Sequence, residues 1–330
     1  MMLAVVIPCF KVKKHISSVI NSIGTEVGRI YVIDDACPEN SGEFVRKNVS
    51  DRRVKVLFHK VNLGVGGAVM TGYQEALKDG CEIVVKIDGD GQMDTRYLAK
   101  LIDPILRKNA DYTKGNRFYD VEHLKSMPTR RMLGNAGLTF ATKLMTGYWS
   151  IFDPTNGYTA ISNTALSRVP FEKISKRYFF ESDMLFRLGL ARAVVKDIPM
   201  PARYQDEKSS LRIGKVLFEF PPKIILRLFK RIAYKYFVRD FNLGTIYLVG
   251  ALLFMFTGGI YGGYHMISNY INNAEAPSGV VMLAGLPIIL GFQLLLSFFS
   301  YDLFTEPVEP IQRVLADVGF VDKKMKVVRE

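Results

Sequence analysis

Cysteine and tryptophan are both scarce in this 330-residue chain. The three cysteines, Cys9, Cys37 and Cys81, are odd in number, widely spaced and without C-x-x-C patterns, and Trp149 is the sole tryptophan. Such a set indicates neither a disulfide framework nor a zinc site. It fits a reducing, cytosolic setting.

The N-terminus lacks the marks of a signal peptide. In MMLAVVIPCFKVKKH a short apolar run is followed by lysines, with no small-residue cleavage site. We therefore interpret this run as a first buried strand. Hydrophobic residues make up 48% of the chain, enough to form a core in one large domain or two smaller ones.

Acidic residues are in deficit. Lys and Arg number 44 against 32 Asp and Glu, which gives a formal charge of +12. An excess of this size suggests an anionic partner, such as nucleic acid, phosphorylated metabolites or acidic lipid. Because the positive charge concentrates beside two apolar runs near the C-terminus, lipid explains it and no nucleic-acid partner is expected.

Two long uncharged runs, about 241–267 and about 280–300, divide the chain. Each is long enough, at about 1.5 Å per residue, to cross roughly 30 Å of hydrocarbon. A pair of buried helices in a soluble core is the alternative, but runs this long without charge are unusual there. The segment between them has no Lys or Arg, whereas both flanks are basic, so the positive-inside rule puts both flanks in the cytoplasm. We expect a transmembrane hairpin followed by a cytosolic tail over 301–330.

A periodic basic pattern precedes the first run, within residues 213–240. Basic residues recur every four positions with apolar residues between them: Lys223, Arg227, Arg231, Lys235 and Arg239. This pattern predicts an interfacial amphipathic helix with a basic face for anionic headgroups. An ordinary solvated helix on the globular domain is the alternative. Pro221 and Pro222 are expected to mark the start of the helix.

Residues 1–212 alternate short β-rich runs with helical patterns. The runs LAVVIP, RIYVIDD, VKVLFH and EIVVKIDGDG are separated by helical patterns near 15–23, 41–48 and 67–78. This alternation predicts an α/β domain with a mostly parallel sheet and right-handed crossovers. Because ligands bind beyond the carboxyl ends of strands in such sheets, polar residues just after strands are the candidates for a site.

Two clusters at such positions are open to a structural or a functional interpretation. Asp34 and Asp35 end the run RIYVIDD. The segment NLGVGGA, at 62–68, follows VKVLFH. Its glycines permit a tight turn into a helix whose N-terminus favours negative charge. A purely structural loop is equally consistent with it.

A third cluster, IDGDGQ, contains Asp88, Asp90 and Gln92. Two carboxylates two residues apart, with glycines between and after them, put oxygen ligands on one side of a turn. A divalent cation can bind there and still accept diphosphate oxygens. A lone D-x-D pattern would suggest a solvated acidic turn, but the apolar strand EIVVKI before it seats the pair at the edge of a sheet.

The ordered set of motifs resembles a known family. The motifs are V-V-I-P, I-D-D, N-x-G-x-G-x-A, D-G-D-G-Q, K-G-N-R and D-P-T-N-G-Y, followed by a terminal membrane hairpin. This order resembles the family 2 glycosyltransferases, and within them the branch of dolichyl-phosphate mannose synthase and the bacterial polyprenyl-phosphate glycosyltransferases. The resemblance implies a GT-A fold that binds a nucleotide sugar, with C-terminal amphipathic and transmembrane helices.

The resemblance also implies roles for individual residues. The divalent cation, Mg²⁺ or Mn²⁺, would be held by Asp88, Asp90 and Gln92. The nucleotide sugar would contact Pro8, Asp35, Asn62, Gly64, Gly67, Asp88 and Arg203. The acceptor phosphate would contact Arg117, one of Arg130 and Arg131, and Lys215. The residues implied in catalysis are Asp88, Asp90, Asp153 and Arg117. Glu181 or Asp183 could match an acidic residue of a family helix, or either could pair locally.

Two departures from the family pattern affect these roles. The acidic residue expected soon after the first strand is replaced by Lys11 and Lys13, so contacts to the base or ribose could differ there. The loop that would close over the phosphates reads RYQDEKSSLRIGK, at 203–215, instead of R-x-x-G-x-S-K. The phosphate contacts of Arg203 and Lys215 are therefore open.

The implied reaction is an inverting displacement in which a polyprenyl phosphate attacks the anomeric carbon of a hexose. A phosphate with a second pKa near 6 is largely dianionic at pH 7 and needs no strong general base. The enzyme must instead neutralise the leaving diphosphate and align two repelling phosphates. The expected donor is a UDP-sugar, with GDP-mannose second, and the acceptor is undecaprenyl or dolichyl phosphate. We expect an integral protein of a prokaryotic plasma membrane with a cytoplasmic catalytic domain. Glycines 258, 259, 262 and 263 suggest a homo-oligomer, for which a tetramer is one option.

Three alternatives remain. A transferase that acts on a preassembled glycolipid would carry the same motifs. A processive polysaccharide synthase would need a Q-x-x-R-W element and more than two spans, and neither is present. A noncatalytic membrane protein that binds nucleotide sugars should have lost a metal carboxylate or a phosphate-binding arginine, whereas Asp88, Asp90 and Arg117 are present.

Overall fold

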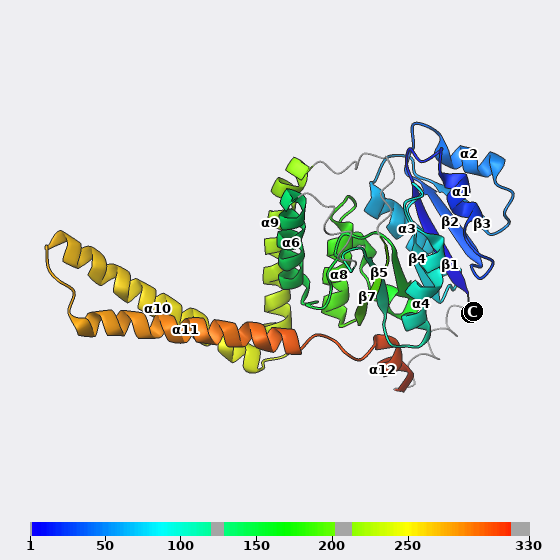
Figure 1. Cartoon of the computed structure of the whole chain (residues 1–330). Coiled ribbons are helices and arrows are strands. Elements are labelled where there is room, and N and C mark those ends of the chain that lie inside the picture. The colour runs from blue at the N-terminus through cyan, green and yellow to red at the C-terminus, as the bar shows by residue number, and fades with distance from the viewer. Residues whose placement is uncertain (1, 120–128, 202–212, 318–330) are drawn as a thin grey trace. The chain divides into compact units, whose positions relative to one another are not determined.

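The computed structural model describes residues 2–119, 129–201 and 213–317 (Figure 1). They form two compact units. The globular unit contains residues up to 228 together with those from 307 onward, and the hairpin unit contains 229–306.

A seven-stranded sheet forms the centre of the globular unit, as Figure 1 shows. Its strands are β1 (Leu3–Cys9), β2 (Arg29–Asp34), β3 (Val54–Phe58), β4 (Ile83–Lys86), β5 (Tyr112–Asn116), β6 (Thr159–Ser162) and β7 (Val195–Pro199). They lie in the order β3-β2-β1-β4-β6-β5-β7. All neighbours are parallel except β6, which runs antiparallel to both β4 and β5. The predicted α/β class with a mostly parallel sheet is confirmed.

The helices connect these strands and continue into the hairpin unit. The globular unit contains α1 (Ile16–Asn21), α2 (Ser41–Asn48), α3 (Val65–Lys78), η1 (Thr95–Tyr97), α4 (Leu98–Leu106), α6 (Thr129–Thr146), α7 (Asn163–Leu166), η2 (Phe171–Lys173), α8 (Phe180–Ala191) and α12 (Ile311–Asp317). Helix α9 (Ile213–Ala233) crosses the boundary between the units, and the π-helical turn η3 (Tyr234–Val238), α10 (Leu243–Ile271) and α11 (Ser278–Phe304) follow.

The sheet has an apolar core on each face. Successive side chains of a strand point to opposite faces, and β1 shows this clearly. Ala4 and Val6 join the cluster that contains residues of α3 and α8, whereas Leu3 and Val5 join the cluster that contains residues of α1 and α4. Because both faces are covered, the central strands are continuous apolar runs, which is typical of parallel sheets.

The segment after the hairpin belongs to the globular unit. Ile311, at the start of α12, is buried in the core. The carboxylate of Asp111 is fully buried and accepts the backbone N–H groups of Val194, Ile311 and Gln312 at 2.9, 2.8 and 3.2 Å. Residues 307–317 are therefore a packed part of this unit, whereas the sequence suggested a separate tail.

Helix α9 begins earlier than the sequence suggested. It extends from Ile213 and contains Pro221 and Pro222, so the prediction that the prolines mark its start is wrong. Phe220 and Ile224 are buried against α6 and α8, with the rings of Phe220 and Phe179 5.0 Å apart. This packing holds the helix together through a position that proline disfavours.

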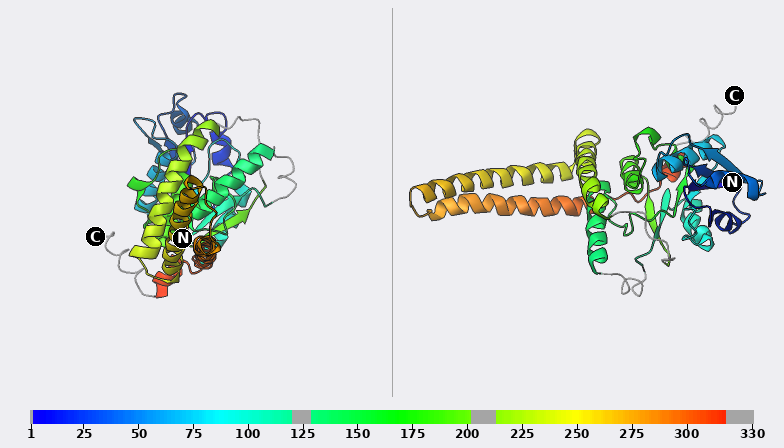
Figure 2. Two further views of the ribbon diagram at one scale, coloured as in Figure 1. Left: turned by 90° about the vertical axis from the view of Figure 1, so that its left-hand side faces the viewer. Right: turned by 90° about the horizontal axis from the view of Figure 1, so that it is seen from above.

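Two long apolar helices, α10 and α11, make up most of the hairpin unit and lie side by side in Figure 1 and in the right view of Figure 2. Both are long and apolar enough to cross a membrane, with mean hydropathies of 1.9 and 2.2 over a stretch of 18 residues in each. Most of their surface is exposed. Gly258 and Gly262 allow close contact with α11, since a Cβ atom at either position would lie under 3 Å from an atom of Ala284. Gly259 and Gly263 have no atom within 4 Å of such a Cβ, and the predicted homo-oligomer stays a prediction.

A group of polar side chains closes the base of the hairpin. The buried Asp302 carboxylate accepts from Arg231 at 2.8 and 2.9 Å, from Lys235 at 2.8 Å and from the Tyr236 hydroxyl at 2.6 Å. Arg227, within the globular unit, pairs in turn with Asp183. The expectation that the periodic basic residues form one lipid-facing stripe is therefore wrong for Arg227 and Arg231.

Candidate active site

The second acidic residue after β2, Asp35, organises the glycine-containing loop. Its Oδ1 accepts the N–H of Leu63 at 2.8 Å, and its Oδ2 accepts the N–H of Gly64 at 2.7 Å. Asn62 returns a hydrogen bond from its side chain to the Asp35 carbonyl at 3.1 Å. Three predicted donor-site residues, Asp35, Asn62 and Gly64, are thus brought together beyond the carboxyl ends of β2 and β3.

His59 completes this arrangement and was missed by sequence reasoning. Its Nδ1 lies 2.7 Å from Asp35 Oδ1, and its Nε2 lies 2.9 Å from Thr71 Oγ1 on α3. The imidazole thus joins Asp35 to α3. A histidine directly after an apolar strand was the available signal in the sequence.

The glycines of the loop serve packing. Gly64 has φ +89°, a conformation that favours glycine. A Cβ at Gly66 would collide with the Ser175 carbonyl, and one at Gly67 would lie 2.5 Å from the Cβ of Leu63. The N–H of Gly67 also donates to the Lys176 carbonyl at 3.0 Å. Of the two interpretations of this loop, the geometry supports the structural one for Gly66 and Gly67.

Pro8, a predicted donor-site residue, and Asp34, the neighbour of Asp35, lie near this loop. Pro8 is near the carboxyl end of β1, opposite Ile33 of β2, so it borders the same edge of the sheet. Asp34 turns inward, where its carboxylate accepts the N–H groups of Cys37 and Gly42, both at 2.7 Å. Asp34 therefore shapes the entry into α2, which leaves Asp35 as the acid that faces the glycine loop.

The DGDGQ turn follows β4, as predicted. Gly91 has φ +80°, and Asp90 Oδ1 accepts the N–H of Gln92 at 3.0 Å. The side chains of Asp88, Asp90 and Gln92 supply oxygen donors from one short turn, which suits a hard divalent cation. The described residues contain no group of three or more His, Cys, Asp or Glu that could hold a metal ion. A cation at this turn would thus need further oxygens from a ligand such as a diphosphate.

The antiparallel direction of β6 brings the DPTNGY loop to this turn. Lys86 of β4 and Lys114 of β5 are both opposite Thr159, the first residue of β6. The loop that leads into β6 therefore begins at the edge where β4 and β5 end. Lys114 donates to the Asn156 carbonyl, and a Cβ at Gly157 would collide with Lys86 Nζ.

Asp153, in the same loop, holds Arg117. The guanidinium donates from Nε to Asp153 Oδ2 at 2.7 Å and from Nη2 to Oδ1 at 3.0 Å. Asp153 is fully buried, whereas the Arg117 side chain is about one third exposed. This arrangement presents a fixed cation at the sheet edge. The carboxylate of Asp153 thus fixes the orientation of Arg117, and the catalytic role implied for Asp153 stays a prediction.

Two buried lysines and the partly buried Glu181 lie behind the DGDGQ turn, and sequence reasoning assigned the lysines no role. Lys86 Nζ lies 2.8 Å from Asp88 Oδ1 and 3.6 Å from Glu181 Oε1. Burial raises the pKa of Glu181 to about 7, although Lys86 and Lys114 act in the opposite direction. Burial also lowers the pKa of Lys114 to about 8. Groups with such shifted pKa values concentrate at functional sites. A lysine at the end of an apolar strand was the signal for Lys86, whereas the strand of Lys114, YTKGN, gave no comparable signal.

Glu181 and Asp183, which the sequence left unresolved, have different surroundings. Asp183 accepts from the N–H and hydroxyl of Ser175 at 2.9 and 2.8 Å and pairs with Arg227 at 2.6 Å. It therefore fixes α8 against α9 and the preceding loop. Glu181 is the acid that faces the DGDGQ turn through Lys86.

Four predicted phosphate contacts are left untested. Arg203 lies outside the described residues. Arg130 and Arg131 are in the first turn of α6 and Lys215 is in the first turn of α9, but their side chains also lie outside what the structure describes.

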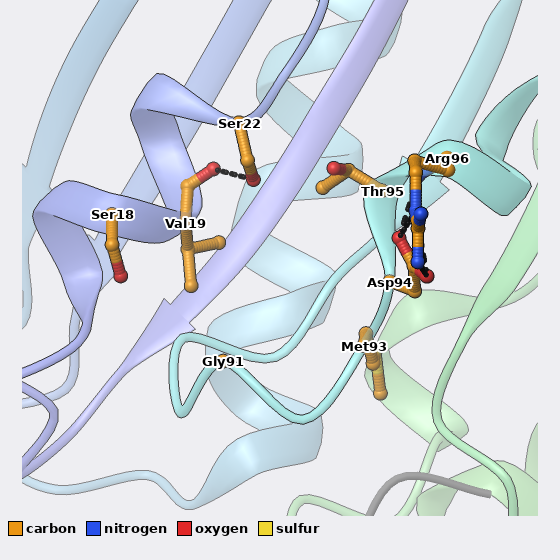
Figure 3. Close-up of a pocket in the computed structure, with 8 residues that line it drawn as sticks. All are labelled: Ser18, Val19, Ser22, Gly91, Met93, Asp94, Thr95 and Arg96. Atoms are coloured by element: carbon orange, nitrogen blue, oxygen red, sulfur yellow. Dashed lines mark hydrogen bonds and ion pairs between the residues drawn. The ribbon is translucent and has the colours of Figure 1, made fainter.

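An open hollow of about 590 Å³ borders the turn on the side of α1 (Figure 3). Its wall includes Ser22, Gly91, Asp94 and Arg96. Ser22 donates to the Val19 carbonyl at 2.7 Å, and Arg96 forms a two-point pair with Asp94. The side chains of Ser22, Asp94 and Arg96 thus already have partners within the chain.

Comparison with known proteins agrees with this geometry. The profile described as Glycosyl transferase family 2 matches residues 4–170. The chain is 30% identical over 237 residues to the UDP-N-acetylglucosamine--dolichyl-phosphate N-acetylglucosaminyltransferase of Methanococcus voltae, which covers 68% of this chain and 93% of that protein. It is 29% identical over 174 residues to the undecaprenyl-phosphate mannosyltransferase of Micrococcus luteus, covering 52% and 70%.

The solved structures share the fold. Glucosyl-3-phosphoglycerate synthase from Mycobacterium tuberculosis, in complex with UDP, superposes with a TM-score of 0.51 and 18% identity over 70% of this chain and 79% of that chain. The fold is therefore of the GT-A type. The family profile and the Methanococcus relative show that the protein is a glycosyltransferase. The chain belongs to glycosyl transferase family 2. The resemblance drawn from the motifs is confirmed.

Proposed function

We propose that this protein transfers a hexose from a nucleotide sugar to a polyprenyl phosphate, with inversion at the anomeric carbon. The observation that carries the proposal is the pairing, at one sheet edge, of a D-x-D turn with an arginine held in place. Arg117 is fixed by Asp153 beside the loop that contacts Lys86 and Asp88. The D-x-D turn would bind the donor diphosphate through a metal ion, and Arg117 would bind an acceptor phosphate. The names of the Methanococcus and Micrococcus relatives, which both specify a polyprenyl-type phosphate, support this acceptor.

The residues of the turn divide the work at the donor. Asp88, Asp90 and Gln92 would hold Mg²⁺ or Mn²⁺, which supplies positive charge to the leaving diphosphate when bound. Asp35, Asn62 and the loop they organise would receive the nucleoside. A UDP-sugar is the favoured donor, since the Methanococcus relative is named for one, and GDP-mannose is second.

Arg117 would align the acceptor phosphate. A dianionic phosphate needs no strong base, so the chain must position two repelling phosphates in line. The bidentate pair with Asp153 uses two N–H groups of Arg117 and fixes the orientation of its guanidinium group at the sheet edge. One of Arg130 and Arg131, together with Lys215 and Arg203, would supply further positive charge.

We infer that α10 and α11 span the membrane and that the globular unit lies on its cytoplasmic side. The length and hydropathy of both helices support this arrangement. Exposed apolar side chains on α9, including Phe218, Ile225 and Leu226, support contact of that helix with the bilayer interface. The isoprenoid tail of an acceptor could then remain in lipid while its phosphate reaches Arg117.

Transfer from radiolabelled donors tests the proposal. Purified full-length protein in detergent is incubated with undecaprenyl phosphate and each of a panel of UDP-sugars and GDP-mannose, with Mg²⁺, Mn²⁺ or EDTA. Label should enter the organic phase from one donor, only with metal. Asp90→Ala should abolish it, whereas Asp103→Ala, at an exposed carboxylate on α4, should not.

The other outcomes separate the alternatives. Labelling of a membrane extract but not of pure undecaprenyl phosphate would indicate a preassembled glycolipid as acceptor. Donor binding without any transfer, by a folded protein, would indicate a noncatalytic scaffold.

A further inference from the structure

The ammonium group of Lys86 is held in place from three directions. Lys86 is the last residue of β4 and is 1% exposed. Its Nζ lies 2.8 Å from Asp88 Oδ1 in the DGDGQ turn and 3.6 Å from Glu181 Oε1 on α8. Gly157 lies against the third side, because a Cβ there would collide with Nζ. A lysine so enclosed cannot move away from the turn without unpairing a buried charge.

The ion pair between Lys86 and Asp88 gives the two carboxylates of the turn different surroundings. Asp88 has one oxygen bound by an ammonium group, whereas Asp90 Oδ1 accepts the N–H of Gln92 at 3.0 Å. When a metal cation and an ammonium group bind the same carboxylate, the two positive charges repel each other. They also share the negative charge of that carboxylate. Glu181 on α8 reduces this repulsion, since its negative charge offsets part of the positive charge of Lys86.

We propose that Lys86, held by Glu181, is a positioning residue that fixes the orientation of Asp88 and competes with the divalent cation for its carboxylate. The inference rests on the proposed function, because it assumes that the DGDGQ turn receives a cation. The turn then binds a cation weakly by itself and well only when a donor diphosphate contributes further oxygens. Lys86 thereby couples cation binding to donor binding. Its fixed ammonium group also holds Asp88 in one orientation.

Binding of Mn²⁺ by the full-length protein, without donor or acceptor, tests this directly. Electron paramagnetic resonance of free Mn²⁺ gives the dissociation constant. We expect Lys86→Met to bind Mn²⁺ about tenfold more tightly, since it removes one competing charge close to Asp88. Its kcat at saturating Mn²⁺ should fall by at least about tenfold, because Asp88 is no longer oriented. Lys86→Arg should restore Mn²⁺ affinity towards that of the unmodified protein.

Two further variants complete the design. Glu181→Gln should weaken Mn²⁺ binding about two- to threefold, the opposite direction, because it leaves the full charge of Lys86 on Asp88. Lys55→Met makes the same substitution at an exposed lysine that pairs with Glu75, and it should change neither quantity. If Lys86 had a purely structural role, Lys86→Met would lower both Mn²⁺ affinity and kcat. The change in Mn²⁺ affinity would then not have opposite directions in Lys86→Met and Glu181→Gln.

The outcomes distinguish this inference from the proposed function. If Asp90→Ala abolishes Mn²⁺ binding but Lys86→Met leaves it unchanged or weaker, the role of Lys86 is overturned and the metal site stands. If Asp90→Ala leaves Mn²⁺ binding unchanged, the turn is not the metal site and the proposed function fails there. Should Lys86→Met not give a cooperative thermal transition, Glu181→Gln decides: unchanged Mn²⁺ affinity in that variant would falsify the competition.

Discussion

Charged groups lie at the base of the hairpin and behind the DGDGQ turn, and their carboxylates differ in the number of hydrogen bonds that they accept. Asp302 receives four hydrogen bonds from Arg231, Lys235 and Tyr236. Behind the turn, Lys86 pairs with both Asp88 and Glu181, and the pKa values of Glu181 and Lys114 are shifted to about 7 and 8. A carboxylate with all its donors in place serves the fold, whereas incompletely compensated charge is a mark of chemistry.

Removal of Asp302 from the hairpin base should have the largest effect. Asp302→Leu leaves Arg231 buried without its partner, so we expect a loss of about 3–5 kcal/mol in the unfolding free energy of the hairpin unit. Thermal and denaturant unfolding of the protein in detergent measures it. The double variant Arg231→Met/Asp302→Leu should recover much of the loss. If the single variant is as stable as the parent, complete pairing at the hairpin base does not stabilise it.

Loss of the partner of Arg117 should instead affect activity. In Asp153→Asn the bidentate pair is broken, and we expect transfer to slow by roughly 100-fold, with a higher KM for the polyprenyl phosphate. Steady-state kinetics and circular dichroism measure the two effects. The matched variant Asp103→Asn, at an exposed ion pair on α4, should behave as the parent. Equal losses in both variants would show that Asp153 has no special role at the site.

The pH dependence of stability should separate the two groups further. The pKa of Glu181 is raised from 4.5 to about 7 in the folded state. Between pH 4.5 and pH 7 the carboxyl group is therefore protonated in the folded state but ionised in the unfolded state. The contribution of this group to stability is thus complete below about pH 4.5 and is lost as pH rises to 7, by an amount on the order of 1–3 kcal/mol. Unfolding measured at intervals from pH 4.5 to 7.5 should show a decline that is flattened in Glu181→Gln. A variant curve parallel to that of the parent would contradict the assignment.

The smallest expected effect concerns the buried Asp111, which bonds to α12. Asp111→Asn keeps an acceptor for the backbone N–H groups but removes the charge that strengthens those bonds, so we expect a loss of about 1–2 kcal/mol. Hydrogen exchange of residues 307–317 should accelerate while exchange of the central strands stays slow. Asp51→Asn, at a partly exposed ion pair, is the control. Unchanged exchange over this segment would show that Asp111 does not hold α12.

Local pattern in the sequence was sufficient for the elements and the class of the protein. Apolar runs at strand spacing predicted β1 to β4, and the D-x-D turn follows directly after β4, as the sequence predicted. The two long uncharged runs predicted α10 and α11 to within a few residues. Each of these features depends on residues that are close together in the chain, so periodicity and turn chemistry are enough to find them.

The partners of the charged side chains were decided by the tertiary structure. Arg117 meets Asp153 over 36 positions, Arg231 meets Asp302 over 71, and Ile311 meets Asp111 over 200. The antiparallel direction of β6 brings Gly157 against Lys86, and no local pattern specifies that direction. Such contacts form only when the sheet order and helix packing bring distant segments together. The sequence by itself therefore determined which chemistry the chain carries, and the fold decided which charges are held fixed for it.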